Sequence, residues 1–143
     1  MQNWIICLKH GDKYSSEYVN KLHNMVRRNC TLPFKFGCYT EKPEGIDPSI
    51  EIFPLPDIGM ISGWWYKPYF FNPNIPTQGR ILYFDLDVIV FKNIDQLFTW
   101  EPNQFCIIRD FNRHIRDDWK RMNSSVFRLS TGQHQYVWDN FIR

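Results

Sequence analysis

An apolar strand that ends in two aspartates is the feature that most constrains this chain. Residues 81–84 read Ile-Leu-Tyr-Phe, and Asp85 and Asp87 follow, separated by one leucine. We expect a strand over residues 80–90, in which side chains two apart lie on one face, about 7 Å apart along the chain. Asp85 and Asp87 would then both point at one spot near the end of the strand. Two carboxylates in apolar surroundings repel each other and favour a divalent cation between them.

The order of apolar patterns predicts an α/β protein. Apolar residues at helical spacing over 16–29 predict an amphipathic helix. Strands are expected at 4–8, 34–38, 50–53, 80–90, 104–109 and 126–129, and further helices at 63–71 and 132–142. Strands that alternate with helices indicate a mainly parallel sheet flanked by helices, with ligands at the carboxyl ends of the strands.

Composition limits the class of protein. With 143 residues, 43% of them hydrophobic and 17% aromatic, the chain is expected to fold as one domain over residues 1–143. Its 17 Lys and Arg residues are spread among 15 Asp and Glu residues, and a net charge of +2 gives no sign of nucleic-acid binding.

The sequence also bears on the compartment. No apolar run approaches the roughly 20 residues of a membrane span, and the chain opens without a signal-peptide pattern. The four cysteines show no C-x-x-C spacing, so we expect reduced thiols. A cytoplasmic protein fits these observations best.

The segment around the two aspartates resembles the metal-binding segment of GT-A fold glycosyltransferases. Leu-Tyr-Phe precedes them and Val-Ile-Val-Phe-Lys-Asn-Ile-Asp-Gln-Leu-Phe follows, which is most similar to the family 8, glycogenin-like and lipopolysaccharide galactosyltransferase-like, retaining enzymes. The resemblance implies a Rossmann-like domain that transfers a hexose from a UDP-sugar. It also implies Mn²⁺, or Mg²⁺, bound directly by Asp87, with Asp85 in contact with the metal and the ribose. The acceptor stays open between a saccharide, a lipid-saccharide and a protein.

The resemblance assigns two residues to the nucleotide. Gly11-Asp12-Lys13-Tyr14 matches the place where these enzymes set a tyrosine against the uracil ring. Tyr14 is therefore expected to stack on the base, and Asp12 to accept a hydrogen bond from it. The residues alone leave open that Tyr14 is an ordinary surface side chain and that Asp12 forms a turn.

Three further residues match the catalytic side of the family. Lys67 matches a basic residue on the helix before the metal strand. In that role it would pair with Asp85 and contact the donor. The alternative is that Lys67 only extends from an aromatic helix into solvent. Asp110 matches an acid that hydrogen-bonds the donor sugar, and a solvated loop aspartate is its alternative. Asn123 begins Asn-Ser-Ser-Val, which is similar to the family's Asn-Ala-Gly-Val segment near the reacting carbon.

The chain departs from the family in its C-terminal part. The family's third metal ligand is a histidine far downstream, and His134 lies too early and in the wrong element for that role. The chain matches the first half to two-thirds of such an enzyme, so the acceptor-binding part would be lacking. A non-catalytic domain that binds a nucleotide sugar or a protein partner therefore stays an alternative, and the aromatic run 64–66 could join two copies.

A haloacid dehalogenase-like phosphatase is the other enzyme class that uses a hydrophobic-Asp-x-Asp pattern. In those enzymes the first aspartate attacks phosphorus and the second acts as acid and base. Their motif normally ends the first strand, whereas 84 residues precede it here and apolar residues follow it. The glycosyltransferase prediction is preferred for that reason.

Overall fold

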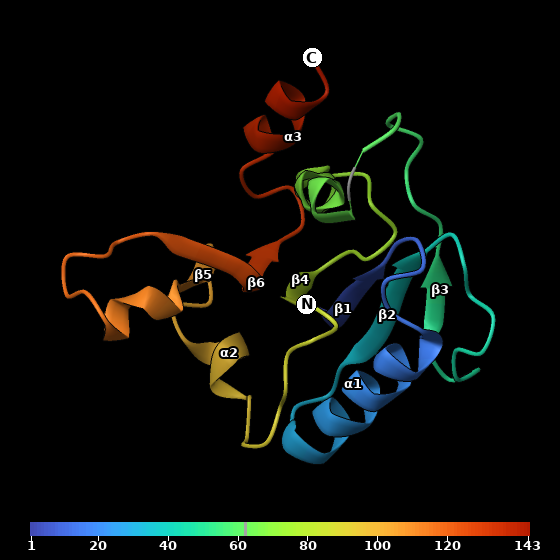
Figure 1. Ribbon diagram of the computed structural model, residues 1–143, viewed down its shortest axis with the longest axis horizontal. Coiled ribbons are helices and arrows are strands. Elements are labelled where there is room, and N and C mark those ends of the chain that lie inside the picture. Colours follow the sequence, from blue (N-terminus) through green and yellow to red (C-terminus); the bar gives the residue numbers. More distant parts are fainter. Residues whose placement is uncertain (62) are drawn as a thin grey trace.

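The chain folds into a six-stranded sheet with helices on both faces (Figure 1). The structure describes residues 1–61 and 63–143, with the exception of the side chain of Arg113. The computed structural model has strands β1 (Asn3–Lys9), β2 (Lys35–Thr40), β3 (Glu51–Phe53), β4 (Arg80–Phe84), β5 (Cys106–Arg109) and β6 (Met122–Ser130). Its α-helices are α1 (Ser16–Asn29), α2 (Gln96–Thr99) and α3 (Tyr136–Phe141), and its 3₁₀-helices are η1 (Gly63–Phe71) and η2 (Phe111–His114).

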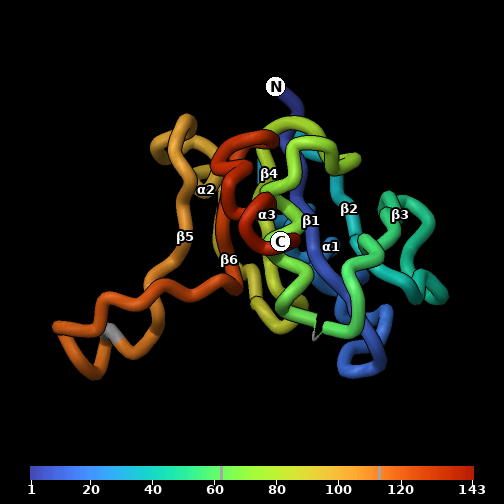
Figure 2. The backbone as a smooth tube through the Cα atoms, turned by 90° about the horizontal axis from the view of Figure 1, so that it is seen from above, coloured from blue at the N-terminus to red at the C-terminus, as the bar shows by residue number. Residues whose placement is uncertain are grey.

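The sheet changes from parallel to antiparallel at β4. Its strand order is β3-β2-β1-β4-β6-β5, which Figure 2 shows from right to left. The pairs β2–β3, β1–β2 and β1–β4 are parallel, whereas β4–β6 and β5–β6 are antiparallel. The predicted α/β class is confirmed, and the carboxyl ends of β1, β2 and β4 lie at one edge of the sheet.

β1 supplies two hydrophobic cores because its side chains alternate between the faces of the sheet. Ile5 and Cys7 belong to the core on the α1 side. Trp4, Ile6 and Leu8 belong to the core on the η1 side. Figure 1 shows α1 and α2 on one side of the sheet and η1 and α3 on the other.

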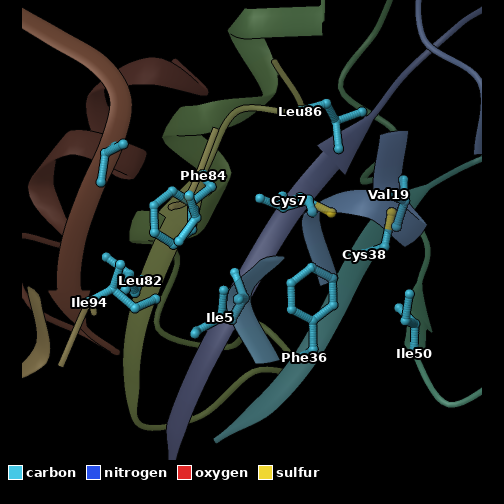
Figure 3. Close-up of a cluster of buried hydrophobic side chains, with 14 of the residues drawn as sticks. Ile5, Cys7, Val19, Phe36, Cys38, Ile50, Leu82, Phe84, Leu86 and Ile94 are labelled. Atoms are coloured by element: carbon cyan, nitrogen blue, oxygen red, sulfur yellow. The ribbon is translucent and has the colours of Figure 1, made fainter. Parts of the chain in front are cut away.

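The core on the α1 side joins the helix to three strands. Val19, Leu22 and Val26 of α1 are fully buried, as their helical spacing predicts. Figure 3 shows the partners that β1, β2 and β4 place on this face, among them Phe36 and Phe84. Burial of this apolar surface is what fixes α1 against the sheet.

The core on the η1 side is mainly aromatic. Tyr66 and Phe70 are the buried side chains of η1, and the Phe70 ring lies 5.5 Å from the Tyr83 ring of β4. α3 covers η1 from outside, where the rings of Trp65 and Phe141 stack at 6.3 Å. η1 is therefore clamped between the sheet and α3.

Two helices have the bounds that the sequence predicts. α1 spans the predicted residues 16–29, with Glu17 in its first turn and Arg27 and Arg28 in its last, an arrangement that suits the helix dipole. η1 spans the predicted residues 63–71 as a 3₁₀-helix that contains a proline. None of the described helices has the length and apolar character needed to cross a membrane.

The strand predicted over residues 80–90 is wrong in its second half. β4 ends at Phe84, and a tight turn begins at Asp85. The Asp85 amide donates to the Ser125 carbonyl at 2.8 Å, and the Val88 amide donates to the Asp85 carbonyl at 3.2 Å. Asp85 and Asp87 thus lie on a turn, not on one face of a strand.

β6 is longer than predicted and carries an irregularity. It begins at Met122 instead of residue 126, so Asn123 is part of a strand. Opposite β5, Phe127 pairs with Ile107 but Asn123 pairs with the next residue, Ile108. Residues 124–126 of β6 therefore have no partner on β5, and such bulges redirect the side chains beside them. α3 is shorter than the predicted helix 132–142, because turns precede Tyr136.

A buried arginine attaches the connection between β4 and β5 to β6. Arg128 is 2% exposed. Its guanidinium donates to the carbonyls of Leu97 at 2.8 Å, Glu101 at 2.5 Å and Gln104 at 3.1 Å. The charge is therefore buried only because it provides donors for three carbonyls of an irregular segment.

We expect Arg128→Met to lower the free energy of unfolding by about 2–4 kcal/mol, because it removes the buried hydrogen bonds to these carbonyls, of which that of Glu101 keeps the Gln104 amide as a donor. Urea unfolding of the variant and the wild type measures the difference. Arg27→Met, at an exposed position of α1, is the matched control and should change the value by about 0.5 kcal/mol or less. Equal stability of the two variants would contradict the role given to Arg128.

Candidate functional site

A cavity of about 260 Å³ opens where β1 and β4 end. It lies at the carboxyl edge of the parallel strands, the place where α/β folds bind ligands. The residues that line it come from the end of β1 and the loop after it, from η1, and from β4 and its turn: Leu8, His10, Lys13, Tyr14, Gly63, Trp64, Lys67, Tyr83, Asp85, Leu86 and Asp87.

The turn after β4 brings both predicted metal ligands to this cavity. Asp85 and Asp87 line it, while Leu86 between them is 5% exposed and belongs to the core on the α1 side. The buried leucine anchors the turn, so the carboxylates on either side face the cavity. The sequence predicted two buried carboxylates, which is wrong for both, because the turn leaves the Asp85 side chain 30% exposed and Asp87 exposed.

Lys67 is the cation that joins the parts of the site. Its Nζ lies 2.9 Å from Asp85 Oδ1 and donates to the carbonyl and hydroxyl of Ser124, each at 3.0 Å. The same Nζ lies 5.2 Å from the centre of the Tyr83 ring. The predicted pairing of Lys67 with Asp85 is thus present, and the lysine does not extend into solvent, since its side chain is only 13% exposed.

Tyr83 is a buried hydrogen-bond donor to Asp85. Its hydroxyl donates to Asp85 Oδ1 at 2.7 Å, and the residue is 1% exposed. Burial raises the pKa of Tyr83 well above its usual value, and the negative charge of Asp85 raises it further. The phenol therefore stays protonated and remains a donor to the carboxylate.

Tyr14 lies beside the second carboxylate. Its hydroxyl donates to Asp87 Oδ2 at 3.3 Å, and its ring lies 4.9 Å from the ring of Tyr18 in an edge-on arrangement. The predicted nucleotide-contacting tyrosine is therefore part of the cavity wall, beside the predicted metal ligand.

Asp12 lies next to the cavity but does not line it. Its carboxylate pairs with Lys42 at 2.5 Å, and the hydrogen bond and charge of Lys42 lower the pKa of Asp12. The contact that the structure gives Asp12 is thus to a lysine beyond the end of β2.

Asp110 and Asn123, the two residues predicted to contact the donor sugar, use their side chains for hydrogen bonds to residues two positions further along the chain. Asp110 follows β5, and its carboxylate accepts from the Asn112 amide at 3.1 Å. Asn123 Oδ1 accepts from the amide and hydroxyl of Ser125, at 2.9 and 2.5 Å. Neither lines the cavity, although Ser124, which bonds Lys67, follows Asn123 directly.

The carboxylates of the turn fit a hard divalent cation. Asp85 uses Oδ1 for Tyr83 and Lys67, and Asp87 uses Oδ2 for Tyr14. The other oxygen of each carboxylate has no hydrogen-bond partner among the described residues, so each can take a ligand. Mg²⁺ and similar ions are commonly held by one or two carboxylates together with phosphate oxygens. Within residues 1–61 and 63–143, no group of three or more His, Cys, Asp or Glu side chains could hold a metal on its own.

The sequence analysis missed two contributors to the site. Ser124 binds Lys67 because the bulge in β6 turns it toward η1, and no sequence pattern marks a bulge. Tyr83 could have been found, since it lies two residues before Asp85 in an alternating strand and so on the same face.

We expect Tyr83→Phe to lower the free energy of unfolding by about 1 kcal/mol, because the ring stays packed while Asp85 loses a buried donor. Tyr18→Phe is the control, since its ring is 44% exposed and no described hydrogen bond uses its hydroxyl. Urea unfolding measures both variants. Similar losses for the two variants would show that the Tyr83 hydroxyl has no particular role.

Comparisons with known proteins show which solved structures have a similar fold. No family model and no curated protein matches the sequence. Among solved structures, the galactosyltransferase LgtC in complex with donor and acceptor sugar analogues is similar, with a TM-score of 0.63 and 15% identity over 95% of this chain. An active-site mutant of LgtC gives a TM-score of 0.64 at 14% identity over 93% of the chain.

The chain is shorter than these enzymes. It spans 61% and 59% of the two LgtC chains. The glycosyltransferase GlyE of Streptococcus pneumoniae TIGR4 is also similar, with a TM-score of 0.58 and 13% identity over 99% of this chain, which spans 36% of the GlyE chain. At these identities the likeness concerns the fold. The predicted resemblance is confirmed at that level: the chain has the GT-A fold of LgtC and GlyE.

Proposed function

We propose that this chain binds a nucleotide sugar, with a UDP-sugar as the donor, and takes part in transfer of its hexose to an acceptor. One observation carries the proposal: Asp85, Asp87 and Lys67 meet in a single cavity at the carboxyl edge of the strands, in a fold that LgtC also has.

The charges of the cavity suit a diphosphate together with a cation. Two carboxylates and two lysines, Lys13 and Lys67, line the cavity, and Lys67 is paired directly with Asp85. Asp85 and Asp87 would hold Mn²⁺ or Mg²⁺, and the metal would neutralise charge on the diphosphate as it leaves. Lys67 fixes the orientation of the Asp85 carboxylate through its ion pair and its two bonds to Ser124.

The remaining predicted residues would contact the two ends of the donor. Tyr14 offers a ring at the β1 side of the cavity for the uracil. Asn123 lies at the β6 side, next to Ser124, and would contact the sugar. Asp110 would reach the sugar from the end of β5. Asp12 would have to leave Lys42 to accept a hydrogen bond from the base.

A nucleotide-sugar-binding domain without transferase activity is the second candidate. It is favoured by the two-carboxylate site, to which the described residues add no third His, Cys, Asp or Glu ligand. In both cases the donor site is the same, and the two candidates differ only in turnover. No conclusion about the acceptor follows from the site.

We expect UDP to bind in the presence of Mn²⁺ and to bind at least about tenfold more weakly without it, a difference of about 1.4 kcal/mol or more. Isothermal titration calorimetry measures both titrations. Asp87→Asn should remove the effect of Mn²⁺, because an amide is a poor substitute for a carboxylate ligand.

Asp117→Asn, at an exposed position that does not line the cavity, is the matched control and should bind as the wild type does. Binding of UDP that ignores both Mn²⁺ and Asp87 would contradict the proposed metal site. Release of UDP from a UDP-sugar by the same protein would then distinguish the transferase from the binding domain.

A further inference from the structure

The cavity contains a histidine held by a carboxylate, and the proposed metal and phosphate contacts do not use this pair. His10 follows β1 and Glu41 follows β2, at neighbouring carboxyl ends of the parallel strands. His10 Nδ1 lies 3.4 Å from Glu41 Oε2. The other oxygen of Glu41 accepts the amide of Gly11 at 2.7 Å. Glu41 is therefore tied at one oxygen to the backbone beside the histidine.

The protonation of Glu41 determines which nitrogen of His10 carries the proton. Burial alone would raise the pKa of Glu41, but the hydrogen bond from the Gly11 amide and the contact with His10 outweigh it, so the pKa is lowered. An ionised carboxylate can only accept hydrogen bonds. The contact with Glu41 thus requires a proton on Nδ1 and leaves Nε2 with a free lone pair when the imidazole is neutral.

The His10 ring packs against η1, and its side chain is 33% exposed. The ring lies 4.9 Å from the Tyr66 ring. Gly63 lies near it as well, since an added Cβ would be in van der Waals contact with His10 Cδ2 at 3.8 Å. Among the described residues Nε2 has no hydrogen-bond partner, and His10 lines the cavity. The ring therefore offers an unused acceptor to a bound ligand.

The place of His10 along the cavity indicates which part of a donor it meets. The carboxylates at the end of β4 would hold the metal and the diphosphate, and Asn123 on β6 lies on one side of them. His10 and Tyr14 lie on the other side, after β1. A nucleotide sugar with its sugar toward β6 has its nucleoside toward β1.

We propose that His10 accepts a hydrogen bond from the nucleoside of the donor through Nε2, and that Glu41 is the positioning residue that keeps this nitrogen unprotonated. The inference rests on the proposed function. It adds a nucleoside contact that selects for a hydrogen-bond donor, which is a base N–H or a ribose hydroxyl.

The test compares UDP binding in Mn²⁺ between the wild type and three variants. His10→Phe keeps a ring against Tyr66 but has no nitrogen, and it should weaken binding about 3- to 10-fold, the range of one neutral hydrogen bond. His10→Gln offers an amide oxygen as acceptor and should restore part of the loss. Glu41→Gln should weaken binding as His10→Phe does, because its amide donates to Nδ1 and moves the imidazole proton to Nε2.

Controls separate this inference from the proposed function and from folding. Glu44→Gln, at an exposed position three residues after Glu41, should bind as the wild type does. If UDP binding depends on Mn²⁺ and Asp87 but is unchanged in His10→Phe, the nucleoside contact is overturned and the proposed function stands. If the wild type binds no UDP, both are overturned.

The nitrogen chemical shifts of the imidazole give a readout in the protein without ligand. In the wild type we expect ¹⁵N spectra to place the proton of neutral His10 on Nδ1, and in Glu41→Gln on Nε2. A proton on Nε2 in the wild type would overturn the inference whatever the binding data. Loss of binding in a Glu41→Gln variant that keeps the proton of His10 on Nδ1 would also overturn it, and a urea unfolding curve equal to that of the wild type shows that the variant is folded.

A second nucleotide identifies the group that His10 contacts. If His10→Phe weakens the binding of UDP but not that of 2′-deoxy-UDP, the partner is the ribose 2′-hydroxyl. If both nucleotides lose affinity equally, the partner is another donor of the nucleoside. Either result supports the contact, and unchanged binding of both nucleotides contradicts it.

Discussion

The change of direction at β4 is the constraint on which the candidate site depends. β4 pairs with the parallel strand β1 on one side and with the antiparallel strand β6 on the other. The turn after β4 is therefore closed by a strand that runs against it, through the Asp85 amide and the Ser125 carbonyl. Without β6 beside it, β4 would have no such partner at this point, and the carboxylates would have no fixed direction.

Lys67 connects the layers of the structure around that turn. Its helix, η1, is packed between the aromatic core of the sheet and α3, and the lysine side chain is only 13% exposed, with its ammonium group 2.9 Å from Asp85. The lysine contacts the turn after β4 and the bulge of β6 at once. A single cation thus couples η1, β4 and β6, the three elements that the proposed donor would also have to span.

The sequence predicted the elements whose burial pattern is periodic. α1 appeared at its predicted bounds because Val19, Leu22 and Val26 repeat at helical spacing. The end of β4 was not predictable in the same way, since residues 88–91 are as apolar as a strand, and the turn is seen only in the structure, in the contact of Asp85 with Ser125 and in the bond from the Val88 amide to the Asp85 carbonyl. Tertiary contacts decide such boundaries, and local composition does not.

For the site, the sequence identified the carboxylates and Lys67, which the structure brings together in one cavity. It did not identify the environment of Asp12, because a salt bridge to Lys42 joins residues from two separate loops. The partnership of His10 with Glu41 has the same origin: the two residues follow different strands, and only the parallel pairing of β1 and β2 makes them neighbours.

The bonds that close the turn also determine when the candidate site is completed during synthesis. Synthesis runs from the N-terminus, so β1, β2 and β4 leave the ribosome before β6 does. While Ser124 and Ser125 are still to be added, the Asp85 amide and two donors of Lys67 lack these partners. The candidate site therefore becomes complete only when β6 is inserted beside β4, and because a domain generally folds as a unit, that insertion and the formation of the sheet belong to the same step.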